Sequence, residues 1–168
     1  MADVPMRRVA RGSGEHALPR VIEQVALSAE FDRALEEIVA RWPGAPVEDE
    51  AFAAYVRAHL DGERDLLGRL PRLRITELFL VWWALESPTG LAAFLATYGQ
   101  DLANTIACVT TRFANLDARR LLDELMIELF GDEPRALEYS GFGPLRAWLD
   151  VVAMQSLLDA AHGHATPA

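Results

Sequence analysis

Apolar residues in this chain recur at three- and four-residue spacing and never alternate over a useful length. That period is typical of amphipathic helices and not of strands. The expected helices cover residues 30–42, 47–60, 75–85, 88–113, 117–130 and 144–161, with a short one at 21–27. We therefore expect an all-α fold, a compact packing of about five to seven helices.

Several residues mark where these helices begin. Ser87 followed by Pro88 suits an N-cap and the first helical position. Asn115 or Asp117 caps the next helix, and Pro144 suits the first position of the last one. The last three helices are expected to share a core that contains Leu121, Leu125, Leu129, Trp148, Leu149 and Val152.

The stretch 75–85, ITELFLVWWAL, differs from the others because it is apolar nearly all round. Such a helix is expected to be buried on most sides. Its apolar run, around Leu78 to Leu85, is also too short to span a membrane, since Glu77 and Glu86 bound it and a span needs roughly 18 apolar residues. No signal-peptide core follows the arginines near the N-terminus, so we expect a cytoplasmic protein.

Charge limits the kinds of partner. The chain holds 16 arginines and no lysine against 25 acidic residues, a net charge of −9. This balance argues against non-specific binding to nucleic acid. The lone Cys108 excludes a disulfide framework.

The sequence offers no catalytic constellation. Its histidines are His16, His59, His162 and His164, and no Ser/His/Asp or Cys/His arrangement can be built from them. There is no glycine-rich phosphate loop. The pair His162 and His164 lacks the further ligands that a metal needs. We expect no enzyme activity, no cofactor, no metal and no small-molecule substrate.

One stretch carries a resemblance to a known family. Residues 139–159 read YSGFGPLRAWLDVVAMQSLLD, in which Arg146 to Leu149 spell RAWL, followed by Ala153 and Asp159. This resembles the RAWL…A…D signature of region 2 of bacterial RNA polymerase sigma factors, of the extracytoplasmic-function type. In that family this helix melts and reads the −10 element of the promoter.

Two further stretches resemble the same family in the same order. Residues 91–98, LAAFLATY, are similar to its first conserved helix. Residues 117–130, DARRLLDELMIELF, are similar to its core-binding helix, usually written DAEDLVQETFLRLW. The resemblance covers residues 91–162, somewhat under half of the chain.

The resemblance implies a division of the chain. We expect a sigma region-2-like domain at 87–162, preceded by a flexible segment at 1–28 and a helical extension at 29–86. A disordered tail is expected at 163–168.

The resemblance also implies a nucleic-acid-binding surface. Tyr139, Phe142 and Trp148 correspond to aromatics that stack on unpaired bases, and Arg146 is the cation beside them. The alternative is that Trp148 is a core residue and that Tyr139 and Phe142 anchor a loop.

A second implied surface is the polymerase-binding face of residues 117–130. In the family this face binds the β′ coiled coil of RNA polymerase. The corresponding residues here are Arg120, Asp123, Glu124, Ile127 and Glu128. The alternative is an ordinary solvated helix face.

The departures from the family affect DNA binding most. Family positions with basic and amide side chains read Asp150, Val151, Met154 and Gln155, and no arginine follows Arg146. We also find no sequence in this chain that resembles the helix-turn-helix of region 4, which reads the −35 element in the family. We therefore expect a protein that acts in transcription initiation or its regulation and binds RNA polymerase core, with promoter DNA binding weak or lost.

Two alternatives remain open. The first is a helical interaction module, a decoy or regulator that engages an anti-sigma factor or polymerase without binding DNA. The second is an unrelated small helical protein that resembles the family only through its amphipathic helices.

Overall fold

The computed structural model describes residues 17–47, 50–60, 66–111 and 116–163. These residues contain helices and no strand, which confirms the all-α prediction. The helices are α1 (Ala17–Arg41), α2 (Glu50–Leu60), α3 (Leu66–Arg69), α4 (Ile75–Glu86), α5 (Pro88–Phe94), α6 (Gln100–Thr110), α7 (Ala118–Phe130) and α8 (Leu145–Gly163). Two short 3-10 helices, η1 (Leu70–Arg72) and η3 (Arg135–Glu138), and a π-helical turn, η2 (Leu95–Gly99), complete them.

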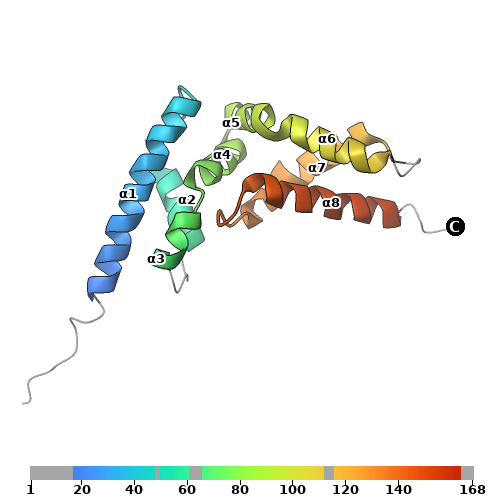
Figure 1. The fold of residues 1–168 in the computed structure, drawn as a ribbon. Helices are drawn as coiled ribbons and strands as arrows, with labels where there is room; N and C mark the ends of the chain where they lie inside the picture. The colour runs from blue at the N-terminus through green and yellow to red at the C-terminus, as the bar shows by residue number, and fades with distance from the viewer. Residues whose placement is uncertain (1–16, 48–49, 61–65, 112–115, 164–168) are drawn as a thin grey trace, which may run out of the picture.

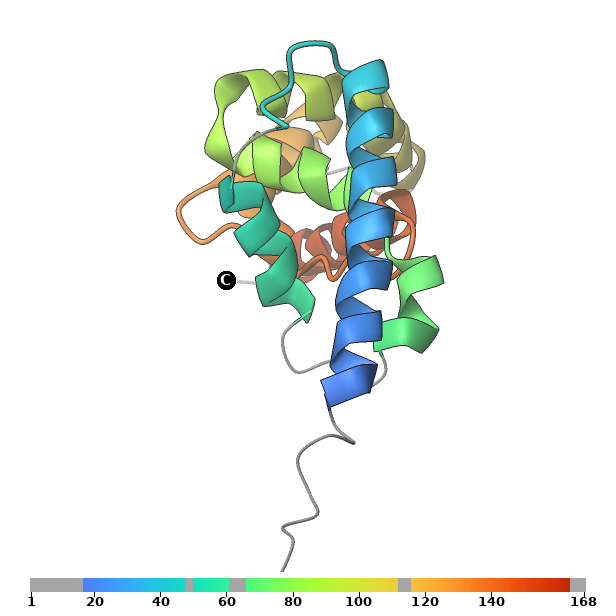
Figure 2. The same ribbon diagram turned by 90° about the vertical axis from the view of Figure 1, so that its left-hand side faces the viewer.

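Helix α4 lies at the centre of the molecule. In Figure 1 α1 lies to the left of α4, whereas α6, α7 and α8 extend to the right. Figure 2, from the left-hand side, shows α1 in front with α2 and α3 on either side of it. Every residue from Leu78 to Ala84 is buried, as expected for a helix that is apolar all round.

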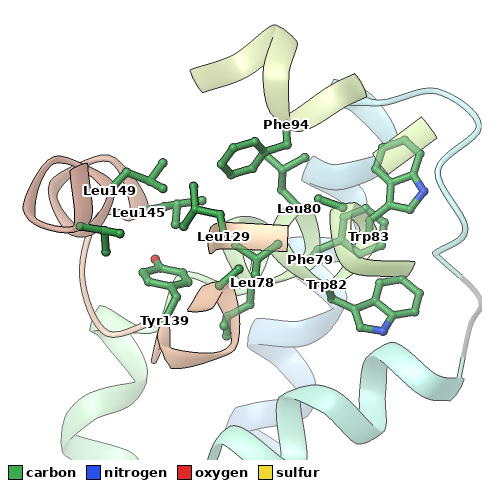
Figure 3. Packing of buried hydrophobic residues seen from close by; sticks show 14 of the residues in the cluster. Leu78, Phe79, Leu80, Trp82, Trp83, Phe94, Leu129, Tyr139, Leu145 and Leu149 are labelled. Atoms are coloured by element: carbon green, nitrogen blue, oxygen red, sulfur yellow. The ribbon is translucent and has the colours of Figure 1, made fainter. Parts of the chain in front are cut away.

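The aromatic residues of α4 face the N-terminal helices. Phe79 lies edge-on to Phe52 of α2, with 5.0 Å between ring centroids. Trp82 lies 5.4 Å from the same ring. Leu78, one turn before Trp82, instead lies toward Tyr139 and Leu129 (Figure 3). Helix α4 therefore contributes side chains to both halves of the core, the half formed with the N-terminal helices and the half formed with the C-terminal helices.

A single cluster of buried residues connects the two halves. It runs from Ala34 of α1 through α4 to Leu157 of α8. The core thus crosses residues 86 and 87, where the sequence analysis places a domain boundary. Helix α1 begins at Ala17, inside the segment expected to be flexible.

The junction between α4 and α5 follows the predicted capping. The side chain of Ser87 accepts a hydrogen bond from the backbone of Gly90 at 3.0 Å, and Pro88 begins α5. Gly90 lies directly against α4, since a Cβ atom there would be 2.0 Å from the carbonyl oxygen of Trp83. Only glycine permits this close approach of the two backbones.

The π-helical turn changes which residues face inward. If residues 88–113 formed one regular α-helix, the spacing of its apolar residues would place Leu95 on the inward stripe. The structure instead leaves the side chain of Leu95 exposed. A π turn holds one more residue than an α turn, which shifts the stripe around the helix axis. After the turn, Leu102 and Ile106 are buried on α6.

Helices α7 and α8 begin close to the predicted positions. The carboxylate of Asp117 accepts from the backbone N–H groups of Arg119 and Arg120, which identifies Asp117 as the N-cap of α7. Helix α8 begins at Leu145, one residue later than expected, and the carbonyl of Pro144 accepts from Trp148 N at 3.3 Å.

The expected shared core of α7 and α8 is confirmed except at one residue. Five of its expected members are buried: Leu121, Leu125, Leu129, Leu149 and Val152. The side chain of Trp148 is half-buried and packs against this core from its edge. The expectation that Trp148 is a full core residue is therefore wrong.

Candidate functional site

Tyr139 is the first residue of the predicted nucleic-acid surface, and the structure places it in the core. Its side chain is 2% exposed. Its hydroxyl shares its hydrogen between Oε2 of Glu77 at 2.7 Å and the carbonyl oxygen of Gly143 at 2.5 Å. Burial, followed by the hydrogen bond to Glu77, raises the pKa of Tyr139 above its ordinary value. The ring is inaccessible to a base in this conformation, so Tyr139 serves as the loop anchor.

Glu77 explains why this loop lies where it does. The same oxygen, Oε2, also accepts from the backbone N–H of Leu145 at 2.6 Å. A carboxylate at this position satisfies a free N–H group of α8 and interacts favourably with the positive end of the helix dipole. Glu77 of α4 thus caps α8 and anchors Tyr139. The helical pattern does not predict this role, although an acid inside an apolar stretch is a signal of it.

Gly141 brings the loop against α4. Its φ of 77° lies in the region that favours glycine, and a Cβ atom would be 2.6 Å from Cδ1 of Leu78. Its carbonyl oxygen accepts from the backbone of Arg74 at 2.8 Å. The loop that holds Gly141 and Gly143 therefore packs against α4 and also separates α8 from the preceding helix.

The other three predicted nucleic-acid residues each have a partner within the protein. The guanidinium of Arg69 lies 3.8 Å from the ring centroid of Phe142 and covers one face of that ring. The ring of Trp148 lies 5.7 Å from that of Tyr139. Arg146 is exposed and pairs with Asp101 of α6 at 3.1 Å. The structure gathers these residues around the start of α8 but does not present them as one open surface.

The predicted polymerase-binding face is largely exposed on α7. Asp123 and Glu124 point to solvent, and Arg120 pairs with Glu124 at 2.8 Å. Ile127 is 70% exposed, a high value for a large apolar side chain. These four residues lie on one side of the helix because they are three or four positions apart.

Glu128 does not belong to this exposed face. Its carboxylate accepts from Arg135 of η3 at 2.5 Å and from the hydroxyl of Ser156 of α8 at 2.5 Å. Arg135 also donates to Glu138 and to Gln155 of α8. Glu128 thus joins α7, η3 and α8 in one polar network, which explains its conformation without any partner protein.

A polar cavity of about 220 Å³ lies between α1, η1 and α4. Its charged lining residues are three acids and three arginines: Glu30, Glu37, Glu77, Arg33, Arg41 and Arg74. The lining therefore carries no net formal charge. Nowhere in the described ranges do three His, Cys, Asp or Glu side chains gather as metal ligands. The side chain of His162 and the whole of His164 lie outside what the structure describes.

No described helix is both long enough and apolar enough to cross a membrane. In the comparisons with known proteins, no family model, no curated protein and no solved structure matches the chain.

Proposed function

We propose that this protein binds RNA polymerase core, through its β′ subunit, and acts in transcription initiation or its regulation in the cytoplasm. The observation that carries the proposal is the exposed face of α7. Asp123, Glu124 and Ile127 lie on this face, on a helix that is capped at its start and fixed by a buried apolar side. The resemblance to the core-binding helix of sigma factors falls on the same residues.

The chemistry of the face suits a basic partner. Glu124 is exposed, and its ion pair with Arg120 contributes little stability in water. An arginine of a partner can therefore replace Arg120 as the partner of Glu124 at small cost. Ile127 adds apolar surface beside the carboxylates. Glu128 is left out of the proposed contact because its carboxylate already accepts from Arg135 and Ser156.

The residues around the start of α8 support the proposal that this protein has lost most of its ability to bind promoter DNA. Tyr139 is buried, and Arg146, the last arginine in the chain, is paired with Asp101. From residue 115 onward the chain has nine acidic residues and four arginines. Phosphate contacts provide most of the affinity for DNA, and this segment repels phosphates. The proposed activity is therefore regulation through polymerase, with promoter DNA bound weakly or not at all.

A pull-down with purified RNA polymerase core tests the proposal. The double variant Asp123→Arg/Glu124→Arg should abolish capture of the core at low salt, because it places cations opposite arginines of β′. Its matched control is Asp32→Arg/Glu36→Arg, which reverses two exposed carboxylates on α1. The control should capture the core as well as the wild type does. Failure of the wild-type protein to capture any core would sink the proposal.

The second candidate is a helical interaction module that engages an anti-sigma factor and does not bind DNA. The observation that favours it is the inaccessible ring of Tyr139 together with the pairing of Arg146. Titration of labelled −10 oligonucleotides separates it from a working sigma factor. Sub-micromolar, sequence-dependent affinity for these oligonucleotides would exclude the interaction module. Absence of DNA binding, together with no capture of RNA polymerase core in the pull-down, would favour it.

A further inference from the structure

Helix α8 carries an apolar stripe on its outer face. Val151, Met154 and Leu158 are 56%, 40% and 48% exposed. Together with the exposed Ala147 they are spaced by four, three and four residues, so they lie on one side of the helix. This alternation of threes and fours is the spacing of the apolar seam of a two-helix coiled coil.

The stripe is separate from the face that holds α8 in the fold. Helix α8 packs mainly on α6 and α7, and its inward face consists of five buried core residues: Leu145, Leu149, Val152, Ala153 and Leu157. Helix α8 is therefore apolar on two opposite sides. An apolar side of a helix is normally covered, and the described part of the chain provides nothing that covers the outer stripe.

The charges around the stripe indicate what kind of partner fits. Both arginines beside it are occupied, Arg146 by Asp101 and Arg135 by Glu128 and Glu138. Asp150 and Asp159 have no ion pair with any described residue. Asp150 accepts a hydrogen bond from the hydroxyl of Thr105 at 3.1 Å, which leaves its charge uncompensated. Asp150 and Asp159 thus give the stripe an acidic surround.

We propose that this stripe, defined by Ala147, Val151, Met154 and Leu158, docks an amphipathic helix of another protein whose apolar face is flanked by lysine or arginine. The apolar seam supplies the contact, and the acidic surround selects a basic helix and repels an acidic one. A second copy of this chain is disfavoured because its net charge is −9 and it would bring the same acidic surround. The inference goes beyond the proposed function, because it concerns α8 and needs no polymerase.

The test uses two synthetic probes and the full chain. One fluorescein-labelled peptide carries leucine at the two seam positions of each heptad and lysine elsewhere, and the second carries glutamate in place of lysine. Fluorescence anisotropy should show binding of the leucine–lysine peptide only. The variant Met154→Ser/Leu158→Ser should bind it at least about tenfold more weakly, as loss of two apolar anchors does.

Two control variants make the result specific. Val39→Ser and Leu95→Ser remove exposed apolar side chains on α1 and the π turn, and they should bind the probe as the wild type does. Asp123→Arg/Glu124→Arg should also retain the stripe's binding, so failure of this inference and failure of the polymerase proposal are distinguishable. Urea unfolding of each variant verifies that it folds.

Three results would overturn the inference. The first is equal loss of binding in the stripe and control variants, and the second is equal affinity for the two peptides. The third is self-association of the wild type in sedimentation that Met154→Ser/Leu158→Ser abolishes, which would assign the stripe to a second copy.

Discussion

Helix α4 is apolar on nearly every side and helix α8 is apolar on two opposite sides, yet their surroundings differ. Helix α4 lies between α1 and α2 on one side and the C-terminal helices on the other, so residues 78–84 are all buried. Helix α8 packs mainly on α6 and α7 and exposes Val151, Met154 and Leu158. The composition of a helix fixes how much apolar surface it has, whereas the fold fixes how many neighbours cover it. The apolar surface that remains exposed on α8 is the reason to look for a partner there.

A pair of identical substitutions tests this comparison with the largest expected effect. Leu78→Ala on α4 should lower the free energy of unfolding by about 3–5 kcal/mol, because a fully buried leucine leaves a cavity. Leu158→Ala on α8 should change it by less than about 0.5 kcal/mol, as exposed positions do. Urea titration of both variants checks the difference. Equal losses would mean that Leu158 is covered in solution.

The contact between α4 and the loop before α8 gives the next largest effect. Gly141→Ala combines a strained φ with a clash against Leu78, so it should cost about 2–4 kcal/mol. Gly44→Ala is the matched control, since Gly44 has a φ of 88° but no atom within 4 Å of the added Cβ. It should cost only the backbone strain, about 1 kcal/mol. Thermal or urea unfolding of the two variants measures the clash by difference, and equal costs would contradict the close packing of Gly141.

Tyr139→Phe tests the polar link between α4 and α8. Removal of the hydroxyl leaves the carbonyl of Gly143 and one site of Glu77 without a donor, so stability should fall by about 1–2 kcal/mol at neutral pH. A change below about 0.3 kcal/mol would mean that water replaces the hydroxyl freely.

The pH dependence of the same variant gives an independent readout. Burial and Glu77 raise the pKa of Tyr139 in the folded state, so above pH ~10 the unfolded chain loses a proton that the folded chain keeps. The unfolded state then binds fewer protons, and stability falls by up to about 1.4 kcal/mol per pH unit for each such tyrosine. Burial also raises the pKa of Tyr55 to about 12, so some alkaline loss remains in Tyr139→Phe. Urea titrations between pH 9 and 11 should show a shallower fall in the variant, and equal slopes would contradict the burial of Tyr139.

The smallest effect is expected at the edge of α8. Arg146→Gln removes an ion pair between the exposed Arg146 and the partly exposed Asp101. It should therefore cost less than about 1 kcal/mol, a loss that salt screens. Urea titrations at low and high salt measure it. A larger, salt-independent cost would show that Arg146 has a structural role in holding α8 on α6.

Much of the local structure was predictable because it depends on neighbours along the chain. The caps at Ser87 and Asp117 follow from side-chain oxygens placed beside free backbone N–H groups. The buried side of α7 follows from apolar residues at helical spacing. The exposure of Leu95 could not be predicted, because the π turn that displaces it has no sequence signal of its own.

The sequence by itself determined the helical class, most of the helix starts and the burial of α4 on most of its sides. Only the tertiary structure decided what the polar residues of the candidate site do. Glu77 meets Tyr139 and Leu145 across 62 and 68 residues of chain, and Glu128 meets Ser156 across 28. Helical spacing describes one helix at a time, so it cannot show which carboxylate lies against which distant donor. The same limit applies to α8, whose outer stripe is exposed because no other described helix lies over it.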